Sequence, residues 1–380
     1  MSEDRIFLSP PHMGGEEQDF VAEAFASNYV APCGPMVDAF EAEVSELSGI
    51  SHTVAVSSGT AAMHLILRHM DVSDRDVVIA SSLTFIGGVN PVLYVDAEPW
   101  FVDADPDTWN MDVDLLAEAI DTCRKKGKMP AAVISTDIYG QCADYDRIRR
   151  VCDPHGIPVI SDSAEAMGAT YKGRHAGAGT AAAVFSFNGN KIMTTSGGGM
   201  VATDDASLAG HVRKLATQAR ENTVHYEHRE TGYNYRMSNI SAAIGRGQLR
   251  VLDKRLDQKR GIYEYYRDEL SRFDGISFMP VASYGIPNHW LACCLFDPQA
   301  CGVSSDAVHR ALEAENIESR PLWKPMHLQP VFRGSPCFGG EVSERLFETG
   351  LCLPSGTALT EEQLDRIVSI VRSTMESDCT

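Results

Sequence analysis

Lys191 is the residue of this chain whose surroundings point most directly to chemistry. It lies in a run of small polar residues and glycines from Ser186 to Gly199, downstream of a strand-like segment at 158–162. A lysine amine is nucleophilic only when it is neutral, and near pH 7 that requires desolvation or nearby positive charge. These surroundings favour an imine-forming lysine over a surface charge, and they predict pyridoxal phosphate as the cofactor.

Asp162 supplies the carboxylate that pyridoxal phosphate needs at its pyridine nitrogen. It follows the apolar pair Val159 and Ile160, and a ligand crevice is expected at the carboxyl end of a buried strand. An ionised aspartate there would keep the nitrogen protonated through a charge-assisted hydrogen bond. Taken alone, Asp162 could equally cap a helix after the strand, but its pairing with Lys191 favours the cofactor role.

A phosphate cradle is predicted between Ser57 and His64. This segment follows a strand-like run and opens a periodic apolar one, so backbone N–H groups and a helix dipole would face one point. Gly59 permits close approach, and the hydroxyl groups of Ser58, Thr60 and Ser186 add hydrogen-bond donors. On its own the segment is also explained by ordinary helix capping.

Composition and charge exclude several classes of function. The 380 residues are 44% hydrophobic and carry a formal net charge of −19, so binding to nucleic acid or to an anionic membrane is not expected. The N-terminus lacks a signal-peptide core, and no stretch approaches the roughly 18 apolar residues of a membrane span. Ten scattered cysteines without a CxxC pair indicate reduced thiols in a cytoplasmic protein, and twelve histidines without zinc spacing predict no metal.

The elements that must position these residues alternate along the chain, which is typical of an α/β fold with a mostly parallel sheet flanked by helices. Helices are predicted at 37–47, 61–69, 114–125, 145–152 and 206–219, and strands at 77–80, 131–135, 159–161 and 200–203. Phe85 follows one of these strands, where its ring could stack on a flat cofactor or could equally belong to the core.

Beyond this region the pattern changes, which predicts two domains. Ser238 is expected to cap a long connecting helix over about 239–272. We expect a large cofactor-binding domain at 1–250 and a small α+β domain at 251–380 with helices at 305–315 and 361–375.

These motifs together resemble the DegT/DnrJ/EryC1/StrS family of sugar aminotransferases, which are pyridoxal-phosphate enzymes of fold type I. The matching segments are 58–62, 84–85, 162–166, 186–195 and 232–239. The chain is especially similar to the bacillosamine-pathway branch, with matches at 7–15, 188–191, 196–199, 217–228 and 320–327. Asn188 and Ser196 depart from many relatives, which have histidine and an acidic residue there, and both departures are shared with that branch.

The resemblance implies a role for each matching residue. Lys191 would bind the cofactor covalently, Asp162 would contact its pyridine nitrogen, Phe85 would pack on its ring and Glu165 would lie by its ring oxygen. The phosphate would be held by Gly59, Thr60, Ser186 and, from the other subunit of a homodimer, Asn234. Arg236 and His327 would lie near the nucleotide sugar, together with Trp323 and Lys324.

The residues themselves leave alternatives open for the substrate group. Arg320, Lys324 and His327 concentrate positive or protonatable side chains in an acidic protein, which suits a diphosphate, but a solvated loop would look the same. Trp323 could fill a core or an interface. Asn234 and Arg236 could be turn residues.

The resemblance predicts transamination of a nucleotide-linked 4-keto-6-deoxy sugar, UDP-4-keto-6-deoxy-N-acetylglucosamine, with glutamate as the amino donor and a 4-amino sugar for glycan biosynthesis as the product. Alternatives are another keto sugar, aminated at C3 or linked to GDP or dTDP, a keto-inositol, and a non-catalytic regulatory protein that binds pyridoxal phosphate. The sugar dehydratases of the family lack the lysine, which is present here as Lys191.

Overall fold

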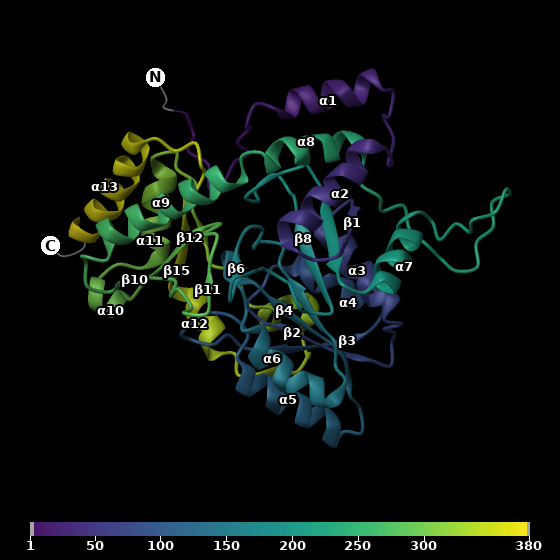
Figure 1. Ribbon diagram of the computed structural model, residues 1–380. Helices are drawn as coiled ribbons and strands as arrows, with labels where there is room; N and C mark the ends of the chain where they lie inside the picture. Colours follow the sequence, from purple (N-terminus) through teal and green to yellow (C-terminus); the bar gives the residue numbers. More distant parts are fainter. Residues whose placement is uncertain (1–3, 378–380) are drawn as a thin grey trace.

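The computed structural model describes residues 4–377 and is built around a mixed sheet (Figure 1). Its eight strands lie in the order β1-β9-β8-β5-β4-β2-β3-β14. Their bounds are β1 (His52–Val56), β9 (Gly199–Thr203), β8 (Ala182–Ser186), β5 (Val159–Asp162), β4 (Pro130–Thr136), β2 (Val77–Ser81), β3 (Glu98–Val102) and β14 (Cys337–Phe338). From β8 to β14 all pairs are parallel, and β9 runs antiparallel to both β8 and β1. The predicted mostly parallel sheet is therefore confirmed.

Helices cover both faces of this sheet, because its central strands are apolar on both sides. In β2, Val78 and Ala80 pack on one face, whereas Val77 and Ile79 pack on the other. The first face is covered by α3 (Gly59–His69), α4 (Asn90–Tyr94) and α7 (Ala206–Ala216). The second is covered by α2 (Pro35–Ser48), α5 (Val113–Lys125), α6 (Tyr145–Cys152) and α8 (Asn239–Leu249).

A smaller antiparallel sheet forms the second part of the molecule, at the left of Figure 1, in the order β10-β12-β15-β13. Its strands are β10 (Ile276–Phe278), β12 (Ala292–Phe296), β15 (Gly350–Leu353) and β13 (Arg320–Pro321). Its core is shared with α9 (Leu252–Leu270), α11 (Ser305–Ala314) and α13 (Glu361–Ser377). The remaining helices are α1 (Glu17–Ala26), α10 (Pro298–Cys301) and α12 (Glu341–Thr349).

The connection between the two parts differs from the expected single helix over 239–272. Ser238 does cap α8, since its side chain accepts from Ser241 N, but the helix ends at Leu249 and α9 begins at Leu252. The reason lies in packing. Ala242 and Ala243 of α8 and Leu252 at the start of α9 belong to the core of the large part, whereas Tyr266 farther along α9 belongs to that of the small part. The break therefore lies where the chain begins to pass from one core to the other.

The two parts are also joined by segments that cross residue 250. Ile6 pairs with Ile317, so the N-terminal segment lies against the small part. In the other direction, β14 extends the large sheet, and β11 (Gly285–Ile286) pairs with β6 (Thr170–Tyr171), which also pairs with β7 (Arg174–His175). The division at residue 250 stays a prediction.

None of the helices described in residues 4–377 combines the length and the apolar character needed to span a bilayer. Over the same residues the nine cysteines are free thiols, and Cys379 lies outside the described part.

Candidate active site

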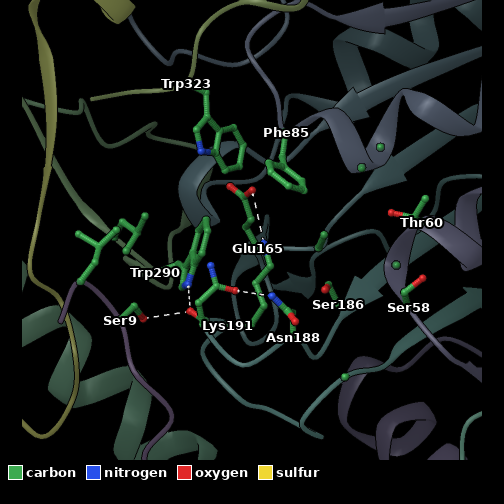
Figure 2. A pocket seen from close by; sticks show the side chains of 18 of the residues that line it. Ser9, Ser58, Thr60, Phe85, Glu165, Ser186, Asn188, Lys191, Trp290 and Trp323 are labelled. Carbon is green, nitrogen blue, oxygen red and sulfur yellow. Dashed lines mark hydrogen bonds and ion pairs between the residues drawn. The ribbon is translucent and has the colours of Figure 1, made fainter. Parts of the chain in front are cut away.

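A cavity of about 810 Å³ opens at the edge where the central strands end. Strand register explains why candidate residues gather there. Val56 and Ser186, the last residues of β1 and β8, both pair with Gly199, and Asp162, the last residue of β5, pairs with Val184. The loops after these parallel strands therefore meet at one edge, the place where α/β sheets bind ligands. Figure 2 shows this pocket with Lys191 near its centre.

Lys191 lies in the loop between β8 and β9, and its side chain is 10% exposed. The loop is closed by hydrogen bonds from Phe187 N to the Gly198 carbonyl and from Thr195 N to the Phe187 carbonyl, each 2.9 Å long. The Nζ atom is 3.7 Å from Oε1 of Glu165. Burial lowers the pKa of Lys191, while the negative charges of Glu165 and Asp162 oppose that shift.

Asp162 and Glu165 place two buried carboxyl groups beside this amine. Oδ1 of Asp162 accepts from Ala164 N at 3.2 Å, and Oε2 of Glu165 accepts from Tyr139 N at 2.7 Å. Burial raises the pKa of both groups, and the Lys191 charge opposes the shift. A Cβ at Gly88 would collide with Oδ2 of Asp162, so the missing side chain at residue 88 leaves the room that this carboxylate occupies.

The predicted phosphate cradle forms the far end of the cavity. Ser58 is the N-cap of α3, and its side chain accepts from Ala61 N at 3.0 Å. The amides of the first helical turn have no acceptor within the helix and face the N-terminal end. A Cβ on Gly59 would lie 3.3 Å from Cβ of Ser186, a tight contact that only a small shift of the serine would relieve. Thr60 and Ser186 also line the cavity.

Aromatic side chains form the wall opposite the sheet. Phe85 is 55% exposed and lines the cavity, so it is not part of the core. Its ring centroid is 5.5 Å from that of Trp323, which lies 5.1 Å from that of Tyr139 and 6.2 Å from that of Trp290. Trp323 is therefore a cavity residue, and a flat ring between this wall and Lys191 would meet aromatic faces.

Four of the predicted residues do not line the cavity of a single chain. Arg236 donates to Oε1 of Glu41 and to the Ala55 carbonyl, and only 7% of its side chain is exposed. His327 is hydrogen-bonded to Ser82 Oγ at 2.6 Å and to Glu344 at 3.0 Å. Lys324 is exposed, and Asn234 lies on the extended segment between α7 and α8.

The cavity also contains residues for which the sequence predicted no role. Ser9, Pro10 and Pro11 belong to the matching segment 7–15, whereas Trp290 and Leu291, just before β12, and Glu318 lie outside every matching segment. Gly87 and Gly88 directly follow Phe85 and Ile86, so the glycine pair was a usable signal for close approach to a ligand. Trp290 carries no such local signal.

Comparison with known proteins agrees with this geometry. Residues 11–372 match the DegT/DnrJ/EryC1/StrS aminotransferase family, and the chain belongs to that family. The enzyme is thus an aminotransferase of a family that modifies sugars, its fold is the type I fold of pyridoxal-phosphate enzymes, and its cofactor is pyridoxal phosphate. A lysine with an enclosed amine, a carboxylate that lines the same cavity and a helix N-terminus rich in hydroxyl groups fit that cofactor.

Three similar proteins show the range of the family. EpsN of Bacillus subtilis (strain 168), a proposed pyridoxal phosphate-dependent aminotransferase, is 46% identical over 97% of this chain and 95% of its own. The GDP-perosamine synthase of Caulobacter vibrioides is 37% identical over 96% of this chain and 97% of its own. The structure of DesI, solved in the presence of its TDP-sugar product, has a TM-score of 0.90 at 29% identity and covers 99% of this chain and 94% of that one.

Proposed function

We propose that this enzyme transfers an amino group from glutamate to C4 of a UDP-linked 4-keto-6-deoxy-N-acetylhexosamine, and that the 4-amino sugar serves glycan biosynthesis. The observation that carries the transamination is the buried Nζ of Lys191, 3.7 Å from Glu165 and inside a cavity of about 810 Å³. A charged surface lysine would have neither the lowered pKa nor the enclosed space.

Each residue of the site has a proposed task. When bound, pyridoxal phosphate supplies a ring that accepts electrons from the substrate carbon. Nζ of Lys191 would take the proton from that substrate carbon as general base and deliver it to C4′ of the cofactor as general acid. The carboxylate of Asp162 would hold a proton on the ring nitrogen through a charge-assisted hydrogen bond. Glu165 orients the ring oxygen, and Phe85 covers the ring and excludes water.

The phosphate end is proposed to be completed by a second copy of the chain. The segment between α7 and α8 extends away from the body of the molecule at the right of Figure 1, and on it Val224 and Tyr226 are 107% and 79% exposed. Such exposure of apolar side chains favours burial against a partner. In the proposed homodimer, Asn234 of the partner subunit reaches the phosphate held by Gly59, Thr60 and Ser186.

The proposal of a UDP-linked sugar rests on the resemblance at Asn188 and Ser196, of which Asn188 lines the cavity. The Nδ2 atom of Asn188 donates to Oδ1 of Asn190 at 3.1 Å. Arg320 lines the rim beside Glu318. We expect Arg236, His327, Trp323 and Lys324 to lie near the nucleotide sugar in the assembled dimer. Arg236, His327 and Lys324 lie outside the cavity of one chain, so their approach to the sugar requires the partner subunit or a rearrangement of the cavity rim.

A GDP-linked 4-keto sugar is the second candidate, because a GDP-perosamine synthase is 37% identical to this chain over nearly its whole length. The deciding experiment incubates the enzyme with glutamate and a panel of UDP-, GDP- and dTDP-linked keto sugars, with the products identified by mass spectrometry and NMR. We expect a UDP-linked 4-amino sugar. Conversion of only a GDP-linked or dTDP-linked sugar would overturn the proposed substrate and leave the transamination standing.

A further inference from the structure

Trp290 lies at the junction between the two parts of the molecule, and each of its polar groups is bonded. It precedes β12 and is 2% exposed. Its backbone N donates to Oδ1 of Asn288 at 2.9 Å, and its indole Nε1 donates to the Asn190 carbonyl at 2.7 Å. Asn288 in turn donates to the carbonyl of Glu165 at 2.7 Å. The indole is thus held in one orientation and bonded to the residue before Lys191.

The Asn190 carbonyl is held by a second donor as well. Ser9 Oγ donates to it at 3.0 Å, and Figure 2 shows the bonds from Ser9 and Trp290 meeting at this one oxygen. Behind both donors lies the buried Nζ of Lys259, which donates to Ser9 Oγ at 3.2 Å, to the Trp290 carbonyl at 2.8 Å and to the Ser355 carbonyl at 2.6 Å. These bonds form a closed network that fixes the backbone at Lys191.

The face of the same indole is directed at the side-chain end of Lys191. Nζ lies 4.0 Å from the centroid of the Trp290 ring, on which a cation is attracted by the ring electrons. Glu165 Oε1 is the other neighbour of this amine, at 3.7 Å. A single side chain therefore contacts Lys191 at its amine and, through the Asn190 carbonyl, at its backbone.

We propose that Trp290 is a positioning residue for Lys191: it fixes the lysine loop through its indole N–H, and its ring face receives the amine when that amine is released. This inference rests on the proposed role of Lys191 in transamination. It also assigns a task to the small part of the molecule, since Trp290 directly precedes β12 of the small sheet, whereas Lys191 lies in the loop between β8 and β9 of the large sheet.

Two replacements separate the two contacts. Trp290→Phe keeps a ring face and removes the N–H donor, whereas Trp290→Leu removes both. Trp100→Phe is the matched control, because Trp100 is also 2% exposed, donates through Nε1 to Glu98 at 3.0 Å and has Lys126 Nζ 4.7 Å from its ring centroid. It lies outside the residues that line the cavity.

The first measurement is the rate at which acetic anhydride labels Lys191 in the full chain after removal of the cofactor, followed from pH 6 to 10 by peptide mass spectrometry. In Trp290→Leu we expect labelling near neutral pH to be about three to ten times faster, with the inflection displaced to lower pH, because the ammonium form loses the ring face. Trp290→Phe should keep most of the wild-type profile, and Trp100→Phe should keep all of it.

The second measurement is steady-state transamination by the cofactor-loaded enzyme. We expect Trp290→Phe to lower kcat about tenfold with the KM for glutamate within twofold, since a lost positioning contact displaces the lysine without removing a substrate contact. The proposal is overturned if Trp290→Phe matches Trp100→Phe in kcat and Trp290→Leu matches it in the labelling profile. Failure of the proposed function is a separate result: Lys191→Ala would then transaminate at the wild-type rate, whereas the labelling profile would still report the contact.

Discussion

Lys191 and Lys259 both have enclosed side chains, but the two amines face different surroundings. Lys191 faces a cavity of about 810 Å³ and the carboxyl groups of Glu165 and Asp162. Lys259 is bonded to two backbone carbonyls and a serine hydroxyl, and it is absent from the lining of that cavity. Burial lowers the pKa of both amines. Desolvation alone therefore does not make a lysine reactive. A reactive lysine also needs space for a ligand and nearby carboxyl groups that can accept and donate protons.

Replacing each lysine in turn is the strongest test of whether Lys191 and Lys259 have different tasks. Lys191→Ala should reduce transamination by at least about 10⁴-fold, because the proton-transferring amine is lost. Lys259→Ala should reduce it only about tenfold, through the loosened support of Trp290. Single-turnover kinetics with glutamate measures both, and circular dichroism verifies the fold. Equal losses in the two variants would mean that the lysines do not have different tasks.

The carboxylate of Asp162, which Lys191 has nearby and Lys259 lacks, is the next feature to test. Asp162→Ala should lower kcat by about 10² to 10³ and weaken cofactor binding, since a preorganised charge at the ring nitrogen is removed. Asp162→Asn, which keeps the shape and loses the charge, should be affected in kcat to a similar degree. Activity of both variants within a few-fold of wild type would show that Asp162 is not the partner of the ring nitrogen.

Filling the space beside Asp162 is expected to have a smaller effect, on the affinity for the cofactor. In Gly88→Ala the new Cβ would meet Oδ2 of Asp162, and overpacking at such a site should weaken cofactor affinity roughly tenfold. Gly210→Ala in α7 is the control, because a Cβ there has no neighbour within 4 Å. Spectroscopic titration of the cofactor-free chain with pyridoxal phosphate measures both. Equal affinities in the two variants would show that the site does not require glycine at residue 88.

The smallest expected effect is the contribution of Lys259 to the free energy of unfolding and its dependence on pH. Burial lowers the pKa of Lys259 to about 7, below that of an unfolded lysine. Between pH 7 and about 10 the unfolded chain therefore holds a proton that the folded chain has released, so this group makes the protein more stable as pH rises. Lys259→Met should lower the free energy of unfolding by about 1–3 kcal/mol near pH 8, because its carbonyl acceptors lose their donor.

Urea unfolding at several pH values tests this prediction. The difference in free energy of unfolding between wild type and Lys259→Met should grow from pH 7 to pH 9. A difference that stays constant or shrinks over this range would show that Lys259 does not release its proton on folding.

Much of the fold and part of the site could be predicted because their signals are local. Asp162 and Gly59 lie at or just after strand-like segments, and parallel strands bring such ends to one edge. The apolar runs predicted β2, β4, β5 and β9 within one residue at each end, whereas β3 and β8 were not predicted. The break between α8 and α9 could not be predicted in this way, because it lies where the chain passes from one core to the other.

The network behind Lys191 was missed for a different physical reason. Trp290 is 100 residues from Asn190, Ser9 is 181 residues from it, and Lys259 is 250 residues from Ser9. No spacing rule links residues that tertiary packing alone brings together. Lys259 also sits in a helix rich in charged residues, where a lysine is normally expected to face solvent.

Covalent trapping tests the assignment of the two lysines most directly. Borohydride reduction of the cofactor-loaded enzyme makes the bond between pyridoxal phosphate and its lysine permanent, and peptide mass spectrometry then locates the modified residue. We predict that the cofactor mass is found on Lys191 and that Lys259 stays unmodified. A cofactor bound to Lys259, or to any lysine other than Lys191, would contradict the account.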